Sequence, residues 1–315
     1  MAVNLCYPPA EDGFRNWIKK CPQVQLRTDH SGGQGWNVKP YAIMRLIDEG
    51  FDEVIWIDSD VIVMRDITRI FGQLHDDIFV ATEDALGDDR DDRNALRARL
   101  WGFSVGRVLP FGLNSGVLRV TKNHYRLMAR WRELLESNTY QDVQKRRWRE
   151  RPAHMLGDQD VLTALLTSKE FAEIPIHILR KGKQILQFNG IYGYTVAERI
   201  GNLLGDNPAF IHSFAGKPWS EQWGVERSDG LRKYIREYVK KVYLDLSPYT
   251  LSVAQFKAEL GCDTEWMGPH YVLSRFLRAL GAGHPELVGL PIAALADLGR
   301  VVKSIRKATR LDRPV

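Results

Sequence analysis

The chain has 315 residues, of which 44% are apolar and 26% are charged. This ordinary globular composition excludes a disordered, collagenous or disulfide-scaffold protein. The length suits either two domains or one α/β domain with a C-terminal extension. A formal net charge of +5 could attract nucleic acid, but the sequence holds no nucleic-acid-binding motif, so we do not expect that partner.

The cysteines and the lack of targeting patterns favour a cytoplasmic protein. Cys6, Cys21 and Cys262 are widely spaced and form no C-x-x-C pair, which argues against a structural zinc site and indicates a reducing compartment. The N-terminus has no signal-peptide pattern. The uncharged run at 287–296 is shorter than the about 20 apolar residues that span a bilayer.

Strand and helix patterns alternate along the first part of the chain, which is typical of an α/β fold. Strands are expected at 3–7, 24–27, 53–57, 78–81, 112–120, 174–179 and 210–212, and helices at 11–20, 36–50, 124–136 and 157–166. From about residue 221 the pattern is helical and basic. We therefore expect a domain over 1–220, with a mostly parallel sheet flanked by helices, and a helical, basic extension over 221–315.

Two aspartates, Asp58 and Asp60, directly follow the apolar strand at 53–57, which has the composition of a strand buried on both faces of a parallel sheet. In an extended chain, residues two apart point the same way with Cα atoms about 6.5–7 Å apart. Their carboxylates would repel each other, and a divalent cation such as Mg²⁺ or Mn²⁺ would relieve that repulsion. The alternative is a pair of turn aspartates that caps the next segment.

Three later segments carry further polar residues. Asn114 and Ser115 open a strand, where small side chains let the backbone approach a ligand, or they form a plain turn. Asp158 and Gln159 begin a helix, where an acid can serve simply as an N-terminal cap. His212 ends a strand, and a lone histidine there is more often structural than catalytic.

The four motifs WIDSDVIV, LNSGVLRV, GDQDVL and IHSFAGKPW occur in this order. Together they resemble the glycogenin-like and lipopolysaccharide-galactosyltransferase-like enzymes of glycosyltransferase family 8, over residues 36–219. The resemblance implies a GT-A fold, a Rossmann-like nucleotide-diphospho-sugar transferase architecture. It also implies a UDP-sugar donor, Mn²⁺ (or Mg²⁺) dependence and transfer of a hexose, glucose or galactose, to a glycan or glycolipid acceptor with retention.

The resemblance assigns roles to single residues of this sequence. The implied metal ligands are Asp58, Asp60 and His212; the donor-binding residues are Lys39, Asn114, Ser115, Gly216 and Lys217; and the residues around the anomeric carbon are Asp158 and Gln159. An amide is a poor nucleophile, so a front-face transfer is preferred to a covalent intermediate.

Two departures from the family pattern bear on these roles. The loop between His212 and Lys217 is one residue shorter than the usual H-x-x-G-x-x-K-P-W spacing, which affects the roles of Gly216 and Lys217. The strand at 3–7 is not followed by the acidic-aromatic turn that grips uridine, so the uridine contacts are unplaced.

Several alternatives stay open at the level of the sequence. An inverting GT-A transferase, a sugar nucleotidyltransferase or a catalytically inactive nucleotide-sugar-binding module would share parts of this pattern. The basic segment at 300–313 fits either peripheral contact with the inner face of an anionic membrane or a solvated basic helix.

Overall fold

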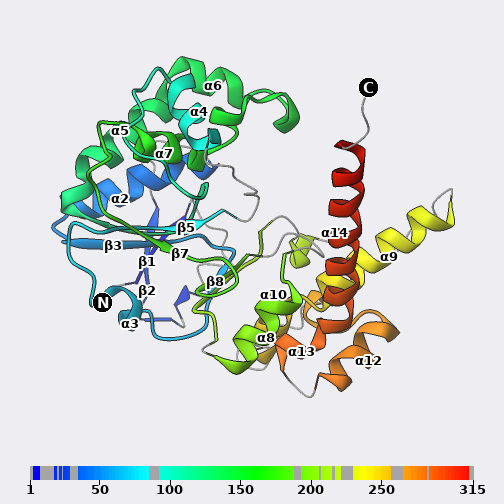
Figure 1. Cartoon of the computed structure of the whole chain (residues 1–315). Helices are drawn as coiled ribbons and strands as arrows, with labels where there is room; N and C mark the ends of the chain where they lie inside the picture. Colours follow the sequence, from blue (N-terminus) through cyan, green and yellow to red (C-terminus); the bar gives the residue numbers. More distant parts are fainter. Residues whose placement is uncertain are drawn as a thin grey trace. The chain divides into compact units, whose positions relative to one another are not determined.

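A four-stranded sheet with helices packed around it confirms the expected α/β fold. In this computed structural model its strands follow the order β3 (Glu53–Ile57), β6 (Leu113–Thr121), β5 (Phe79–Glu83) and β7 (Ile176–Leu179). Figure 1 labels β3, β5 and β7 of this sheet. The structure describes residues 3–7, 18–19, 21–22, 24–28, 35–84, 92–187, 193–205, 207–214, 217–220, 230–256, 265–281 and 284–311.

The chain divides into two compact units. Unit 1 comprises Met1–Trp56, His75–Ala81 and Asp88–His177, and unit 2 comprises Ile57–Leu74, Thr82–Gly87 and Ile178–Val315. The domain boundary near residue 220 that the sequence suggests stays a prediction.

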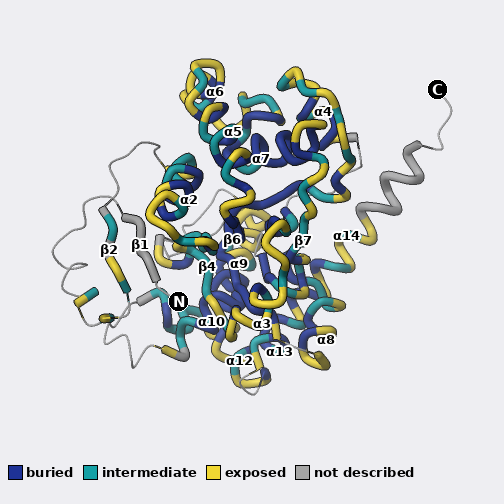
Figure 2. The backbone as a smooth tube through the Cα atoms, turned by 90° about the vertical axis from the view of Figure 1, so that its left-hand side faces the viewer, coloured by how far each residue is buried: buried dark blue, intermediate teal, exposed yellow. Residues whose placement is uncertain are grey.

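Unit 1 is built around β6, whose nine residues are all buried (Figure 2). Its helices are α2 (Lys39–Asp48), α4 (Asp92–Leu100), α5 (Tyr125–Glu136), α6 (Asn138–Gln144) and α7 (Asp158–Thr167). Helix α5 packs against α2 and α7 through a helical stripe of buried side chains, namely Leu127, Met128, Trp131, Leu134 and Leu135. The periodic apolar pattern at 124–136 therefore predicted α5 correctly.

The first two strands of unit 1 pair with each other. β1 (Val3–Tyr7) and β2 (Val24–Thr28) form a parallel two-stranded sheet, with Val3 opposite Val24. Both strands lie where the sequence predicts them. The helix expected at 11–20 falls largely outside the described residues.

Unit 2 holds a three-stranded sheet with the order β4 (Val61–Val63), β9 (Phe210–His212) and β8 (Ile185–Gln187). β9 runs antiparallel to β4 and parallel to β8. The sequence predicted β9 but not β8, although both strands have three residues.

The helices of unit 2 include the helical C-terminal region that the sequence predicts. They are α3 (Thr68–Phe71), α8 (Val196–Leu204), α9 (Leu231–Asp245), α10 (Pro248–Gln255), α12 (Val272–Leu280), α13 (Pro285–Val288) and α14 (Leu290–Leu311). Val242, Leu277 and Ile292 belong to one buried core cluster, which joins α9, α12 and α14. Within the described part of the chain, no helix is both long enough and apolar enough to cross a membrane.

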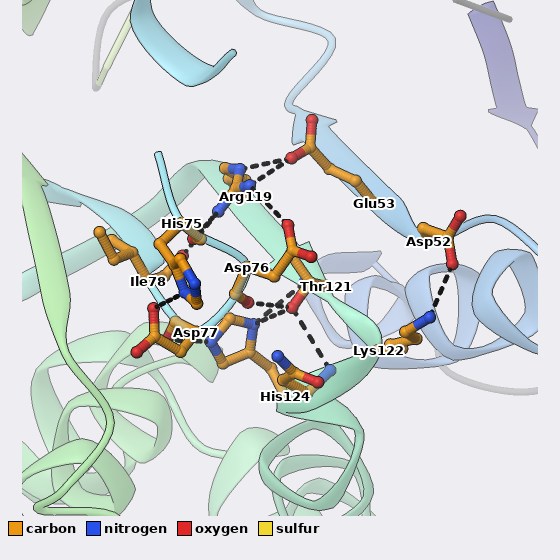
Figure 3. Close-up of polar contacts among 11 residues, drawn as sticks. Asp52, Glu53, His75, Asp76, Asp77, Ile78, Arg119, Thr121, Lys122 and His124 are labelled. Carbon is orange, nitrogen blue, oxygen red and sulfur yellow. Dashed lines mark hydrogen bonds and ion pairs between the residues drawn. The ribbon is translucent and has the colours of Figure 1, made fainter. Parts of the chain in front are cut away.

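A buried arginine, Arg119, ties β6 to the loop that precedes β5 (Figure 3). Its side chain is 2% exposed, and its guanidinium donates to the carbonyl oxygens of His75 at 3.1 Å and Ile78 at 2.9 Å, and to the Glu53 carboxylate at 2.5 Å. One buried side chain therefore pairs with two backbone carbonyl groups of this loop and with a carboxylate on β3.

We expect Arg119→Met to lower the free energy of unfolding by about 3 kcal/mol, because the carbonyl oxygens of His75 and Ile78 and the carboxylate of Glu53 lose the buried guanidinium that donates to them. Urea denaturation followed by circular dichroism measures the change. The control is Lys122→Met, which breaks the exposed ion pair with Asp52 (Figure 3) and should leave the unfolding midpoint unchanged. An Arg119→Met variant as stable as wild type would contradict the role assigned to this network.

Candidate functional site

In unit 2, the two aspartates lie in a turn between β3 and β4. The N–H of Val61 donates to the carbonyl oxygen of Asp58 at 3.0 Å and closes a turn over residues 58–61. The sequence analysis assumed an extended chain here, and that assumption was wrong. β3 and β4 belong to different sheets, so the chain turns at the aspartates instead of continuing as one strand.

Strand register brings His212 to this turn from a point far along the chain. His212 pairs with Val61 across β4 and β9, and the N–H of Ser213 donates to the carbonyl oxygen of Asp60 at 2.9 Å. The imidazole thus lies beside the carboxylate of Asp60, with 3.4 Å between His212 Nε2 and Asp60 Oδ1.

Asp58, Asp60 and His212 form the acid–imidazole cluster of unit 2. One potential ligand atom from each residue lies within 4.8 Å of the other two. Among the described residues, no other group of three or more acids, histidines and cysteines meets this criterion. The two aspartates are partly exposed, whereas His212 is buried. Two carboxylates and one imidazole are a donor set that Mn²⁺ or Mg²⁺ accepts in proteins.

Lys217 contacts the same aspartate. Its ammonium donates to the Asp60 carboxylate and, at 2.6 Å, to the carbonyl oxygen of Ser213. Burial acts to raise the pKa of Asp60, but hydrogen bonding and charge from His212 and Lys217 outweigh burial and hold that pKa well below its usual range. Asp60 is therefore ionised at neutral pH. Gly216, the donor-binding residue next to Lys217, lies outside the described residues.

In unit 1, three predicted residues form a buried polar chain, which we call the Lys39–Asp158 cluster. Lys39 Nζ donates to Ser115 Oγ at 2.7 Å, and Ser115 Oγ donates to Asp158 Oδ2 at 2.8 Å. Lys39 Nζ also lies 3.3 Å from Asp158 Oδ2. All three side chains are buried, and Asp158 begins α7, where the helix dipole favours a negative charge.

Asn114 and Gln159 adjoin this cluster through β6 and α7. Asn114 Nδ2 donates to Gln159 Oε1 at 2.9 Å, and Asn114 Oδ1 accepts from the N–H of Gly116 at 2.9 Å. The indole of Trp131 donates to the carbonyl oxygen of Asp158 at 3.0 Å, which fixes the start of α7. The unit-1 residues that the sequence singled out thus form two hydrogen-bonded groups, which are adjacent along β6 and at the start of α7.

The capping interpretation fits the second acid of α7. Asp160 Oδ2 accepts from the N–H of Gly157 at 3.0 Å, which satisfies one of the free N–H groups at the helix start. Asp158 instead directs its carboxylate to Ser115 and Lys39. The two acids of this helix start therefore have different partners.

Sequence reasoning missed Arg97, a cation near these acids. Arg97 Nε lies 3.2 Å from Asp160 Oδ1, and its NH1 donates to Asn94 Oδ1 at 2.6 Å. Both Arg97 and Asn94 lie on α4, a helix for which the sequence analysis made no prediction. Asn94 and Arg97 are three positions apart, which places them on one face of a helix, and this spacing was the sequence feature that could have predicted their contact.

No family model and no curated protein sequence matches this chain. Among solved structures, one similar structure is a glycosyltransferase involved in the glycosylation of the major capsid of PBCV-1, with 12% identity over 69% of this chain and 95% of that chain and a TM-score of 0.40. Another is the galactosyltransferase LgtC in complex with donor and acceptor sugar analogs, with 16% identity over 75% of this chain and 83% of that chain and a TM-score of 0.42.

A third similar structure is the glycosyltransferase GlyE of Streptococcus pneumoniae TIGR4, with 16% identity over 82% of this chain and a TM-score of 0.41. The chain spans 56% of the length of GlyE. These three structures are glycosyltransferases, the class that the sequence motifs resemble, and the chemistry of the two residue clusters carries the proposal that follows.

Proposed function

We propose that this chain is a metal-dependent, retaining glycosyltransferase with a GT-A fold, which moves a hexose, glucose or galactose, from a UDP-sugar to a glycan or glycolipid acceptor. The observation that carries the proposal is the acid–imidazole cluster. Asp58 and Asp60 meet His212, which lies more than 150 positions further along the chain, within 4.8 Å through a turn and a strand pairing.

The residues of this cluster fit a divalent cation. Asp58 and Asp60 would supply carboxylate oxygens, and His212 would supply one imidazole nitrogen. The other imidazole nitrogen, Nδ1, is buried and has no hydrogen-bond partner among the residues that the structure describes. When bound, the cation would neutralise negative charge on the departing diphosphate. Lys217, which now contacts Asp60, would add a second positive charge to that leaving group.

The Lys39–Asp158 cluster and its neighbours would bind the donor sugar. Asp158 is an ionisable hydrogen-bond acceptor for sugar hydroxyls, and Lys39 and Ser115 hold its carboxylate in one orientation. Gln159, which Asn114 fixes, would lie beside the anomeric carbon. Its neutral amide fits a front-face transfer, in which the departing phosphate takes the proton of the acceptor hydroxyl.

A panel of UDP-sugars, assayed for hydrolysis with and without added Mn²⁺, tests this function. We expect Mn²⁺-stimulated release of UDP from UDP-glucose or UDP-galactose and a product with the anomeric configuration of the donor. Inversion, read by proton NMR, would support an inverting GT-A transferase, and release of pyrophosphate from a nucleoside triphosphate and a sugar phosphate would support a nucleotidyltransferase.

One observation favours a second candidate function, a catalytically inactive nucleotide-sugar-binding module. The ammonium of Lys217 already neutralises Asp60, which is the carboxylate that a catalytic cation would need. UDP binding by calorimetry that is indifferent to Mn²⁺, without hydrolysis of any UDP-sugar, would support that module over the enzyme.

The C-terminal helix α14 supports a proposal about location. We propose that the protein is cytoplasmic and contacts an anionic membrane peripherally through α14, where the exposed apolar side chains of Leu298 and Val301 flank Arg300. Sedimentation with vesicles rich in anionic lipid should recover the full chain but not a chain that ends at residue 298. Identical sedimentation of the two proteins would leave α14 as a solvated basic helix.

A further inference from the structure

Gln187, at the end of β8, is a buried side chain whose polar atoms lack partners. It is 1% exposed, and within the described part of the chain neither Oε1 nor Nε2 makes a hydrogen bond. A buried amide without hydrogen bonds destabilises the folded state. Its presence therefore indicates a ligand or a hydrogen-bond partner that the unliganded arrangement does not supply. The sequence analysis did not single out this residue.

The strand register places Gln187 next to His212. In the parallel pair of β8 and β9, Gln187 is the partner of His212, and neighbouring strands lie about 4.8 Å apart. Paired residues of adjacent strands point to the same face of a sheet, so the amide and the imidazole share one face. Phe214 packs edge-on against the His212 ring, with 5.5 Å between ring centroids, and offers no side-chain acceptor.

His212 needs an acceptor if it binds a cation. A neutral imidazole carries one N–H and one lone pair. Nε2 faces Asp60 at 3.4 Å and is therefore the nitrogen available to a cation shared with Asp60, so in the cation-bound protein the imidazole proton must be on Nδ1. That Nδ1 is buried without a partner, whereas metal-bound histidines almost always donate their second N–H to a carboxylate, a carbonyl or water.

We propose that Gln187 is a positioning residue for the proposed metal ligand His212. Its Oε1 accepts the proton of His212 Nδ1 through one buried water, and thereby keeps the lone pair of Nε2 directed at the cation. The inference rests on the proposed function, because it assigns to Gln187 the orientation of a ligand in the acid–imidazole cluster. It makes Gln187 necessary for tight cation binding although it does not touch the cation.

Mn²⁺ binding to the full chain, followed by electron paramagnetic resonance, tests the proposal. Gln187→Leu keeps a similar volume and removes the acceptor, so we expect about 10- to 100-fold weaker Mn²⁺ binding. Gln187→Glu keeps an acceptor and should retain most of the affinity. The matched control is Ser274→Ala, which removes another buried, unpartnered polar atom, on α12, and should leave Mn²⁺ affinity unchanged.

Stability separates this role from a purely structural one. Replacing an unpartnered buried amide by an apolar side chain should leave the urea unfolding midpoint equal or higher in Gln187→Leu, while cation affinity falls. Gln187→Leu with wild-type Mn²⁺ affinity would overturn the proposal.

A second readout needs no metal. Long-range ¹H–¹⁵N spectra of the histidine-labelled, metal-free protein report the tautomer of His212, which the His212→Asn variant assigns. We expect a larger fraction of Nδ1–H in wild type than in Gln187→Leu, in which Nε2–H, donated to Asp60, should prevail. Wild type that binds no Mn²⁺ would contradict the proposed function, and in that case equal tautomers in the two proteins would overturn the role of Gln187 as well.

Discussion

Replacing Asp60 with asparagine is expected to abolish Mn²⁺-stimulated release of UDP, with a loss of at least about 100- to 1,000-fold in kcat. The amide keeps the size of the side chain but removes the charge that would hold the cation. His212 and Lys217 already stabilise the ionised form of Asp60 and lower its pKa, so the carboxylate is charged at every pH at which the enzyme would work. Initial rates of UDP release across a Mn²⁺ titration measure the effect.

The control for this variant is Asp66→Asn in the same unit. Asp66 is exposed and accepts from the N–H and the hydroxyl of Thr68 at the start of α3, at 2.9 Å and 2.7 Å. Its replacement should leave the Mn²⁺ dependence unchanged. An Asp60→Asn variant with wild-type activity would remove the acid–imidazole cluster from the mechanism.

Replacing Asp158 with asparagine is expected to damage both stability and transfer. Lys39 is 3% exposed, and without the carboxylate its buried ammonium loses its charge partner. Breaking a buried ion pair in this way costs about 3–5 kcal/mol of unfolding free energy. We also expect at least about a 100-fold loss of kcat, because the carboxylate that would position the sugar hydroxyls is gone.

A double variant separates these two effects. Lys39→Met combined with Asp158→Leu removes both charges, so it should recover much of the lost stability and none of the activity. Urea denaturation and donor hydrolysis on the same preparations measure both quantities. The control Asp142→Asn breaks the exposed pair with Lys145 and should change neither. Activity in the double variant would show that Asp158 contributes to stability and not to transfer.

The sequence predicted those parts of the fold that carry a strong local pattern. The apolar run at 53–57 and the periodic stripe at 124–136 correspond to β3 and α5. Both elements were predictable because the positions of apolar residues in the sequence reflect which side chains are buried. Strand β8 has no such pattern in the sequence. Its residues Ile185–Gln187 form a strand because they pair with β9, a segment distant in the sequence.

The sequence indicated which residues form the candidate site, but it did not predict how they are arranged. Asp58, Asp60 and His212 were chosen from motifs, but the turn that brings the two aspartates together depends on β3 and β4 entering different sheets. Arg97 was missed because α4 is a polar helix, which few apolar positions mark in the sequence. Gln187 was missed because only its burial and its register with His212 distinguish it from an ordinary strand residue.

The most direct measurement of the central claim is anomalous X-ray diffraction from crystals of the full chain grown with Mn²⁺ and UDP. The claim predicts an anomalous peak about 2.2 Å from the carboxylate oxygens of Asp58 and Asp60 and from His212 Nε2, with the diphosphate beside it. A fully bound UDP with no anomalous peak at these three residues would contradict it.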